Sequence, residues 1–493
     1  MTVSTALPHW DMTVVFPGLE SPEFDAEFDA VVGEIGDLEK LLDANHVSPG
    51  DSRPIDEATV HAFDAVVAAL EQLETRLHTL DAYIRTFVTT DSYNQLAQAR
   101  TSELRQHAVR LTKLSTRFTA WIGSLDVDEL VARSSTAQRV EFAIRKANTL
   151  ARHLLPLPEE DLFADLDLTG GSAWSHLYAD VTSRLLVPFQ VDGHAEELPM
   201  SRIRNLAYDA DRDVRERAYH AELAAWEGAA TPLAAALNSI KGQSNTMQLR
   251  RGWPEVLDFA LFMNNVDRGT LDAMMESARA SFPDFRRYMH AKAKVLGLPK
   301  LAWYDLFAPA GRMSRTWSFD DAHHFLVEQF STFSSRLAGL ADRAFTERWI
   351  DAEPRPGKVG GAFCMWLRGD QSRVLSNYME SYDGVSTLAH ELGHAYHNFN
   401  LAGRSIMQRQ TPMTLAETAS IFCETIIEHA ALERADELEQ LAILEASIQG
   451  SCQVVVDISS RFMFERSVFE ARQKRDLSIE EFGRLMLDSQ RQT

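Results

Sequence analysis

Residues 383–403 read DGVSTLAHELGHAYHNFNLAG, and this stretch decides the predicted fold and site. At about 100° per residue, its apolar side chains fall on one broad face of a helix, with Asp383 as a cap at the start and Gly403 after the end. The histidines cluster on the opposite side of that helix. The helix is therefore expected to be anchored by Val385, Leu388, Leu392, Tyr396 and Phe399, and to present His390, His394 and His397.

Two of these histidines stand four residues apart in His390-Glu391-Leu392-Gly393-His394. Side chains at that spacing lie one above the other on a helix, so both imidazoles can reach one metal ion. Glu391 is turned by about 100° from His390, and it can reach a water on that ion without binding the ion itself. The pattern predicts a zinc-peptidase site with Glu391 as the catalytic residue. A surface or core role for the histidines is the weaker explanation.

A catalytic zinc ion usually has three protein ligands and one open position. No histidine follows at the short spacing of a three-histidine site, so the third ligand is sought in residues 411–435, TPMTLAETASIFCETIIEHAALERA. This segment predicts a helix with Thr411 as its N-cap. Glu417 is the candidate ligand, and Glu424, on the same face, is the candidate acceptor that orients a ligand imidazole. From spacing alone, a capping box between Thr414 and Glu417 explains Glu417 equally well.

Three neighbouring residues are assigned other roles. His397 and Asp383 are expected to support the site from behind the ligands, since His390, His394 and one glutamate already complete it. Packing is the alternative role for His397. Cys423 is expected to point away from Glu417 and to behave as a small buried hydrophobe.

The composition of the 493-residue chain excludes several classes of protein. A formal charge of −22 argues against nucleic-acid binding, which needs concentrated Lys and Arg. That charge is explained most simply by solubility, and less simply by an acidic channel that attracts cationic peptides. Three scattered cysteines are too few for a disulfide framework, and neither a secretory signal nor a membrane-spanning run is expected. A cytoplasmic protein fits these features.

Helical periodicity dominates the rest of the chain and predicts a mainly α fold. Long segments rich in Ala, Leu, Arg and Glu indicate amphipathic helices over 57–89, 96–123 and 137–155. The pattern breaks over 156–172, and Asp192-Gly193 between apolar stretches predicts a hairpin. Helices resume over 201–296, with an interruption at 252–254. A chain of this length favours two lobes, with an N-terminal helical lobe at 1–190 and a catalytic domain at 191–493.

Residues 357–381 differ from this helical pattern. Their glycines, apolar alternation and β-branched residues predict two or three short strands with a turn at Arg368-Gly369-Asp370. A small sheet beside the zinc-binding helix can hold an extended peptide along its edge. A purely structural hairpin that covers one face of the helix is an equally good interpretation.

The chain resembles the oligoendopeptidase F and thimet oligopeptidase family of zinc peptidases. The family motif His-Glu-x-Gly-His-x-x-His is matched by residues 390–397, and its ligand glutamate by Glu417-Thr418-Ala419-Ser420. Glu424 corresponds to a later glutamate of the family. Further segments similar to the oligoendopeptidase F branch are Trp303–Pro309, Gly357-Lys358, Gly361-Ala362-Phe363 and Ile240-Lys241-Gly242. The resemblance covers most of the chain, more loosely before residue 190.

The resemblance implies a two-lobed helical fold with the zinc site at the floor of a deep channel. It implies a cytoplasmic oligopeptidase that binds one zinc ion, takes short peptides as substrates and cuts them at internal bonds. It also favours Glu417 as the ligand over the capping box. The strands of residues 357–381 would then line the cleft, with Gly360, Gly361, Ala362 and Phe363 as candidate contacts to substrate.

One departure from the family concerns the C-terminal end. The family carries a His- and Tyr-rich segment beyond the glutamate helix, whereas this chain has no tyrosine after Tyr396 and no histidine after His429. The resemblance therefore suggests a C-terminal truncation and leaves the donors that stabilise the oxyanion unidentified. Losing one such donor costs on the order of 10²–10³ in turnover. A zinc-containing peptide binder with little turnover and a helical scaffold with a chance motif are the two alternatives.

Overall fold

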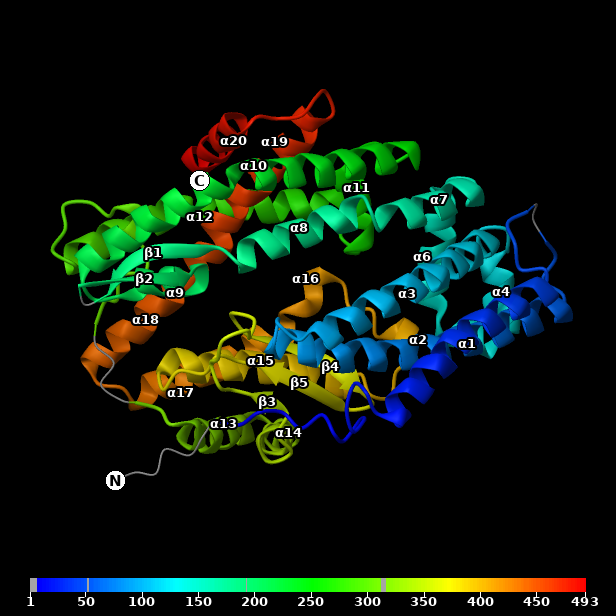
Figure 1. Ribbon diagram of the computed structural model, residues 1–493, viewed down its shortest axis with the longest axis horizontal. Coiled ribbons are helices and arrows are strands. Elements are labelled where there is room, and N and C mark those ends of the chain that lie inside the picture. The colour runs from blue at the N-terminus through cyan, green and yellow to red at the C-terminus, as the bar shows by residue number, and fades with distance from the viewer. Residues whose placement is uncertain (1–6, 51–52, 192, 312–315) are drawn as a thin grey trace. The chain divides into compact units, whose positions relative to one another are not determined.

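The structure is a computed structural model that describes residues 7–50, 53–191, 193–311 and 316–493 (Figure 1). Helices make up most of these residues, and the strands form two small sheets. This arrangement confirms the mainly α fold class.

The chain divides into two compact units, and each is assembled from two separate stretches. Unit 1 comprises Met1–Ala164 and Arg315–Ala430, and unit 2 comprises Asp165–Ser314 and Ala431–Thr493. The sequence instead placed a single contiguous boundary near residue 190. The difference arises because residues 315–430 pack with the N-terminal helices rather than with the segments on either side of them in the chain. A functional division at residue 190 stays a prediction.

In unit 1 the N-terminal helices share one hydrophobic core. The long helices of this core bury Phe24, Phe63, Leu80 and Ile122 completely or nearly so. The predicted helices 57–89 and 96–123 are confirmed, whereas the one predicted over 137–155 is divided at Val140. The N-terminal helices of this core are α1 (Pro22–Ala44), α2 (Glu57–Thr90), α3 (Gln95–Ile122), α4 (Val127–Arg133), α5 (Ser135–Arg139) and α6 (Glu141–Ala151). Helix α7 (Leu157–Asp167) follows them and extends past the end of this stretch of unit 1 at Ala164.

A second core in unit 1 surrounds the helix that carries the histidines. Its helices are α13 (Phe319–Phe333), α14 (Ser335–Thr346), α15 (Tyr382–Asn400) and α17 (Thr418–Arg434). The short elements η3 (Ile406–Gln408) and α16 (Met413–Ala416) lie between α15 and α17 in the chain, and Met407 of η3 packs against the first core. Cys423 is buried in the second core, as predicted.

The break predicted over 156–172 is wrong, because α7 occupies most of it. Leu162 and Leu166 are exposed on this acid-rich helix.

A three-stranded sheet lies beside α15 in unit 1, in the order β3-β5-β4 (Figure 1). Strands β4 (Phe363–Arg368) and β5 (Gln371–Leu375) form the predicted hairpin, and Gly369 adopts a positive φ of 53° in its turn. The third strand, β3 (Ile350–Asp351), lies upstream of the segment predicted to hold strands and pairs parallel to β5. Strand β4 is therefore an edge of this sheet.

A buried group of charges fixes the loop between β3 and β4. Asp351 accepts hydrogen bonds from Arg355 at 2.7 and 3.0 Å, and Lys358 Nζ lies 2.7 Å from the same carboxylate. Lys358 also donates to the backbone carbonyls of Asp351, Glu353 and Ser376. Burial acts to raise the pKa of Asp351, but the hydrogen bonds from Arg355 and Lys358 outweigh it and lower that pKa. The loop that leads into β4 is thus held by a paired, buried carboxylate.

Unit 2 contains a hairpin and a set of long helices. The predicted hairpin is formed by β1 (Leu186–Val191) and β2 (His194–Pro199), with Asp192 outside the described residues. Gly252, at a φ of 78°, separates two helices at the predicted interruption. The helical elements are α8 (Gly171–Ser183), α9 (Met200–Asn205), η1 (Leu206–Tyr208), α10 (Arg212–Arg250), α11 (Val256–Met263), α12 (Arg268–Val295), η2 (Trp303–Asp305), α18 (Glu437–Cys452), η4 (Gln453–Asp457), α19 (Ile458–Arg472) and α20 (Ile479–Gln492).

One described helical stretch, Glu437–Arg472, meets the length and hydropathy criteria for crossing a membrane, which was not expected from the sequence. Core helices of soluble proteins and signal sequences meet the same criteria, so length and hydropathy alone do not assign this stretch to a membrane. Within this stretch Glu445 pairs with the buried ammonium group of Lys292 at 2.5 Å.

Candidate metal centre

Helix α15 is anchored by the face that the sequence predicted. Val385, Leu388 and Leu392 are fully buried, and Tyr396 and Phe399 pack against the same core. The predicted cap is wrong: Ser381 is the N-cap and its hydroxyl accepts from the Gly384 N–H, because the helix begins two residues earlier than expected, at Tyr382. Asp383 is an exposed residue of the first turn.

Gly393 allows α15 and the start of α17 to approach closely. A β-carbon on Gly393 would lie 2.6 Å from the carbonyl oxygen of Ala419 and 2.6 Å from the Cα of Ser420. Real β-carbons do not come so close to backbone atoms, so only glycine fits at this point. The missing side chain brings the glutamate segment against the histidine helix.

Glu417 lies at a break between two helices. The sequence predicted one helix capped by Thr411, but the short helix α16 has Pro412 at its N-cap and ends at Glu417, and α17 begins at Thr418. The Thr411 prediction is therefore wrong, because the chain interrupts the helix at the glutamate. Thr414 lies inside α16, so it cannot be the N-cap that a capping box with Glu417 requires.

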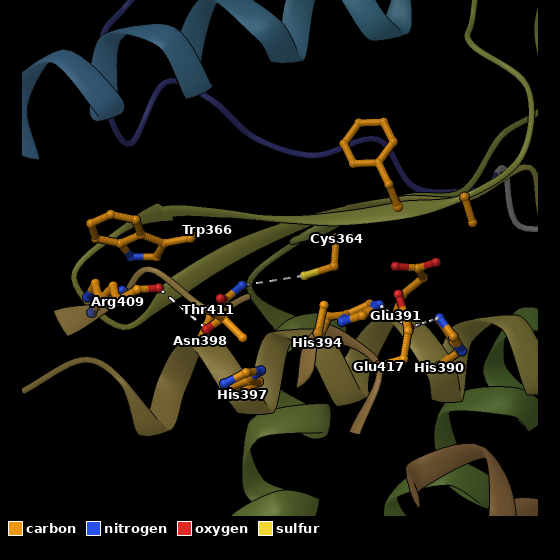
Figure 2. Close-up of a pocket in the computed structure, with 13 residues that line it drawn as sticks. Cys364, Trp366, His390, Glu391, His394, His397, Asn398, Arg409, Thr411 and Glu417 are labelled. Atoms are coloured by element: carbon orange, nitrogen blue, oxygen red, sulfur yellow. Dashed lines mark hydrogen bonds and ion pairs between the residues drawn. The ribbon is translucent and has the colours of Figure 1, made fainter. Parts of the chain in front are cut away.

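Ser420 holds the Glu417 carboxylate in place. Its buried hydroxyl donates to Glu417 Oε2 at 2.6 Å. The same Oε2 atom lies 3.2 Å from Nε2 of His390 and 3.2 Å from Nε2 of His394. The structure thus brings the three candidate ligands together (Figure 2).

The spacing of these atoms suits a tetrahedral metal ion. Zinc bonds of about 2.0–2.1 Å at tetrahedral angles place neighbouring ligand atoms about 3.3 Å apart. The two distances of 3.2 Å from Glu417 Oε2 match that value. One nitrogen or oxygen from each of the three residues lies within 4.8 Å of the others.

The contacts of His390 give a chemical reason for a cation at this place. Its Nδ1 lies 3.3 Å from Glu424 Oε2, and because a carboxylate can only accept, Nδ1 carries the proton. In a neutral ring Nε2 is then an acceptor, and it faces the Glu417 carboxylate, another acceptor. Two acceptors at 3.2 Å need a proton or a metal ion between them. The donor set therefore fits zinc.

The environment shifts the pKa values of the two imidazoles in opposite directions. The hydrogen bond to Glu424 raises the pKa of His390, with burial opposing it. Burial lowers the pKa of His394, which favours the neutral form that binds metals. Burial also lowers the pKa of His397, which lies one turn further along α15.

Glu391 is a buried carboxyl group at the same site, with an exposed fraction of only 5%. Burial raises its pKa to about 7; His390 opposes this shift and Glu417 reinforces it. Its Oε2 atom is buried and has no hydrogen-bond partner among the described residues. An unsatisfied buried oxygen beside the candidate ligands suits a group that receives a proton from a water molecule.

A pocket of about 520 Å³ contains these residues (Figure 2). Of the residues predicted from the sequence, it is lined by His390, Glu391, His394, His397, Glu417, Ala362 and Phe363. Gly360, Gly361, Asp383 and Glu424 are not among its lining residues. Gly361 contributes indirectly, because Asn377 donates to its carbonyl and so fixes the entry to β4.

Six pocket residues were not predicted from the sequence: Cys364, Trp366, Asn398, Arg409, Thr411 and Ala416. The period of two in a strand places Cys364 and Trp366 on one face of β4, and that signal was available once the strand was recognised. Asn398 lies one residue after His397 and donates to Ser372 Oγ on β5. No local pattern marks Arg409, and the sequence singled out Thr411 only as an N-cap candidate. Both belong to an irregular segment whose position depends on the tertiary fold.

Family models match two segments of the chain. The model described as Peptidase family M3 matches residues 205–475, more than half of the chain, and the model described as Oligopeptidase F matches residues 122–185. The group B oligopeptidase PepB of Streptococcus agalactiae is 24% identical over 96% of this chain and 78% of its own length. An oligoendopeptidase F homolog of Lactococcus lactis is 28% identical over 56% of this chain and 46% of its own length.

Solved structures share the fold at lower sequence identity. The crystal structure of oligoendopeptidase-F from Enterococcus faecium has a TM-score of 0.67 at 17% identity, covering 95% of this chain and 79% of that chain. The crystal structure of a putative peptidase from Chlamydophila abortus has a TM-score of 0.70 at 18% identity, covering 98% and 81%. Together with the family models, these matches define a metallo-oligopeptidase. The chain belongs to peptidase family M3.

Proposed function

We propose that this chain is a zinc-dependent oligopeptidase that hydrolyses internal bonds of short peptides. His390, His394 and Glu417 would bind one zinc ion, and Glu391 would act as the general base. The main observation in support of this proposal is the position of Glu417 Oε2, which lies 3.2 Å from Nε2 of both histidines.

The proposed mechanism assigns a task to each residue around the ion. A bound zinc ion would lower the pKa of a water molecule and polarise the scissile carbonyl. Glu391, with its unpartnered Oε2, would take the proton of the attacking water and pass it to the leaving amine. Glu424 would hold the Nδ1 proton of His390, so that Nε2 keeps a free lone pair. His397 and Asp383 are proposed only as supporting residues.

The proposed substrate is a short peptide that lies along β4. An edge strand offers backbone groups for pairing with an extended peptide, and Ala362 and Phe363 line the pocket where β4 begins. Gly360 and Gly361 are proposed to give the peptide room beside this edge. A pocket of about 520 Å³ lies within the range typical of small ligands and accommodates a few residues. A cytoplasmic location, without nucleic-acid or membrane partners, completes the proposal.

The proposal is tested with internally quenched peptides and a metal chelator. Chelation should abolish cleavage, and added zinc should restore it. Glu391→Gln should keep zinc while turnover falls by about 10²–10⁴, because the general base is lost. Glu433→Gln, which changes an exposed glutamate, is the matched control. Zinc-loaded protein that binds peptide without cutting it would indicate a binder, and protein that takes up no zinc would indicate a scaffold.

A further inference from the structure

The end of the pocket away from the ligand histidines is built from stacked side chains (Figure 2). The His78 ring of α2 lies 4.2 Å from that of Trp366, at an interplanar angle of 16°. The Arg409 guanidinium carbon lies 3.9 Å from the centre of the same indole. Both groups therefore pack against the Trp366 side chain and hold it in place.

Hydrogen bonds hold Arg409 in this position without neutralising it. Its Nη2 donates to the carbonyl of Gly369 at 2.9 Å, and its Nε donates to that of Arg404 at 3.3 Å. Both partners are neutral backbone oxygens. Among the described residues no carboxylate lies within ion-pair distance of Arg409. The guanidinium therefore lines the pocket with an unpaired positive charge, in a chain whose formal charge is −22.

The open edge of β4 ends at the same point. The carbonyl of Trp366 is already engaged by His78 Nε2 at 2.9 Å, so a peptide paired along β4 cannot continue past Trp366. A peptide that runs from the candidate metal ligands along β4 reaches the guanidinium at this end of the pocket. A planar guanidinium with free N–H groups is suited to bind a carboxylate.

We infer that Arg409, held against Trp366, binds a carboxylate of the peptide substrate and so sets the substrate preference of the enzyme. This inference rests on the proposed peptidase function. The carboxylate is either an acidic side chain or the C-terminus of the peptide, since the guanidinium recognises the same group in both. Arg409 selects against peptides that are neutral at this position.

The experiment measures peptide binding to the zinc-loaded Glu391→Gln protein, in which a peptide stays intact. Labelled versions of one hexapeptide are compared by fluorescence anisotropy. They are a neutral peptide with an amidated end, the same peptide with a free C-terminus, and a set of amidated peptides with one Glu at each position in turn. At least one carboxylate peptide should bind about 10-fold more tightly than the neutral amide, as expected for one charge-assisted hydrogen-bonded pair. If the peptide with a free C-terminus binds more tightly than the neutral amide, the bound carboxylate is the C-terminus. If a Glu-containing amide does so, the bound carboxylate is an acidic side chain.

Substitutions then assign the preference to Arg409. Arg409→Gln should reduce the ratio between the Kd of the neutral amide and the Kd of the carboxylate peptide to about 1. A merely structural role would weaken both peptides alike and leave that ratio at its original value. Arg404→Gln removes the same charge from an exposed residue of the same segment. This variant should still bind the carboxylate peptide about 10-fold more tightly than the neutral amide. If Arg409→Gln prefers the carboxylate peptide over the neutral amide as strongly as the protein with Arg409 does, the inference is overturned, because the carboxylate then binds elsewhere, for example to zinc.

Two further results keep the inference separate from the proposed function and from misfolding. If no carboxylate peptide binds more tightly than the neutral amide to the protein with Arg409 intact, the inference fails without any variant at that position. Chelator-sensitive cleavage of the neutral amide by the unsubstituted chain would show that the peptidase function still holds in that case.

Discussion

Gly393 lies so close to Ser420 that a β-carbon on the glycine would be 2.6 Å from the serine Cα. Ser420 in turn donates its hydroxyl to the Glu417 carboxylate. The contact between the two helices therefore sets the position of the candidate third ligand. The glycine in the motif acts through backbone packing, although it binds nothing itself.

Substitution of Gly393 by Ala should weaken metal binding without removing a ligand. Helix propensity alone favours Ala by about 1 kcal/mol, but the clash with Ala419 and Ser420 forces the segments apart, and overpacking costs about 1–3 kcal/mol. We expect zinc affinity to fall at least about 10-fold in a competition assay with a chromophoric chelator. Gly403→Ala, where a β-carbon meets nothing within 4 Å, is the matched control. Equal affinities in both variants would contradict this account.

Glu424→Gln should lower zinc affinity by about 10–100-fold, the usual effect of removing the acceptor behind a ligand imidazole. The amide can still accept a hydrogen bond from His390 Nδ1, but it no longer carries the charge that stabilises this tautomer. Titration of the apoprotein with zinc measures the effect. Glu433→Gln again serves as the control, and an unchanged affinity in Glu424→Gln would assign Glu424 to another role.

Much of this site could be predicted from the sequence because its signals are local. The spacing of His390 and His394 and the apolar face of α15 depend only on helix geometry. The break at Glu417 could not be predicted in the same way, because the segment has strong helical propensity and the break lies where the chain approaches α15 closely, a tertiary contact. Arg409 was missed for a related reason: only the fold brings it to Trp366.

The fold shows the same division between local and tertiary information. Helices α2 and α3 follow their sequence periodicity almost to the residue. The composition of the two units could not be predicted, because it depends on contacts between residues far apart in the chain. Asp351 and Lys358 are another example, since an isolated charge pair in a sequence does not reveal that it will be buried.

Stability should depend on pH through Asp351. Its pKa is lowered in the folded protein, so its charge stabilises the fold above the unfolded-state pKa, and this contribution is lost as the pH falls through the folded-state value. Asp351→Asn leaves the buried Lys358 without its charged partner and should cost about 3–5 kcal/mol at neutral pH.

Thermal unfolding from pH 7 down to about pH 3 measures this effect, and the difference in melting temperature between the parent and Asp351→Asn should shrink below about pH 4. Asp370→Asn removes a half-exposed partner of Arg343 and should cost less than about 1 kcal/mol. A difference for Asp351→Asn that stays constant across the pH range would exclude a role for its charge.

Zinc content tests the central claim most directly. The purified chain is loaded in a zinc buffer, passed through a desalting column and analysed by inductively coupled plasma mass spectrometry. The parent chain should carry one zinc ion per molecule, and Glu417→Ala should lose it under the same conditions. Retention of a full equivalent of zinc by Glu417→Ala, or no zinc in the parent chain, would contradict the assignment of His390, His394 and Glu417 as the metal ligands.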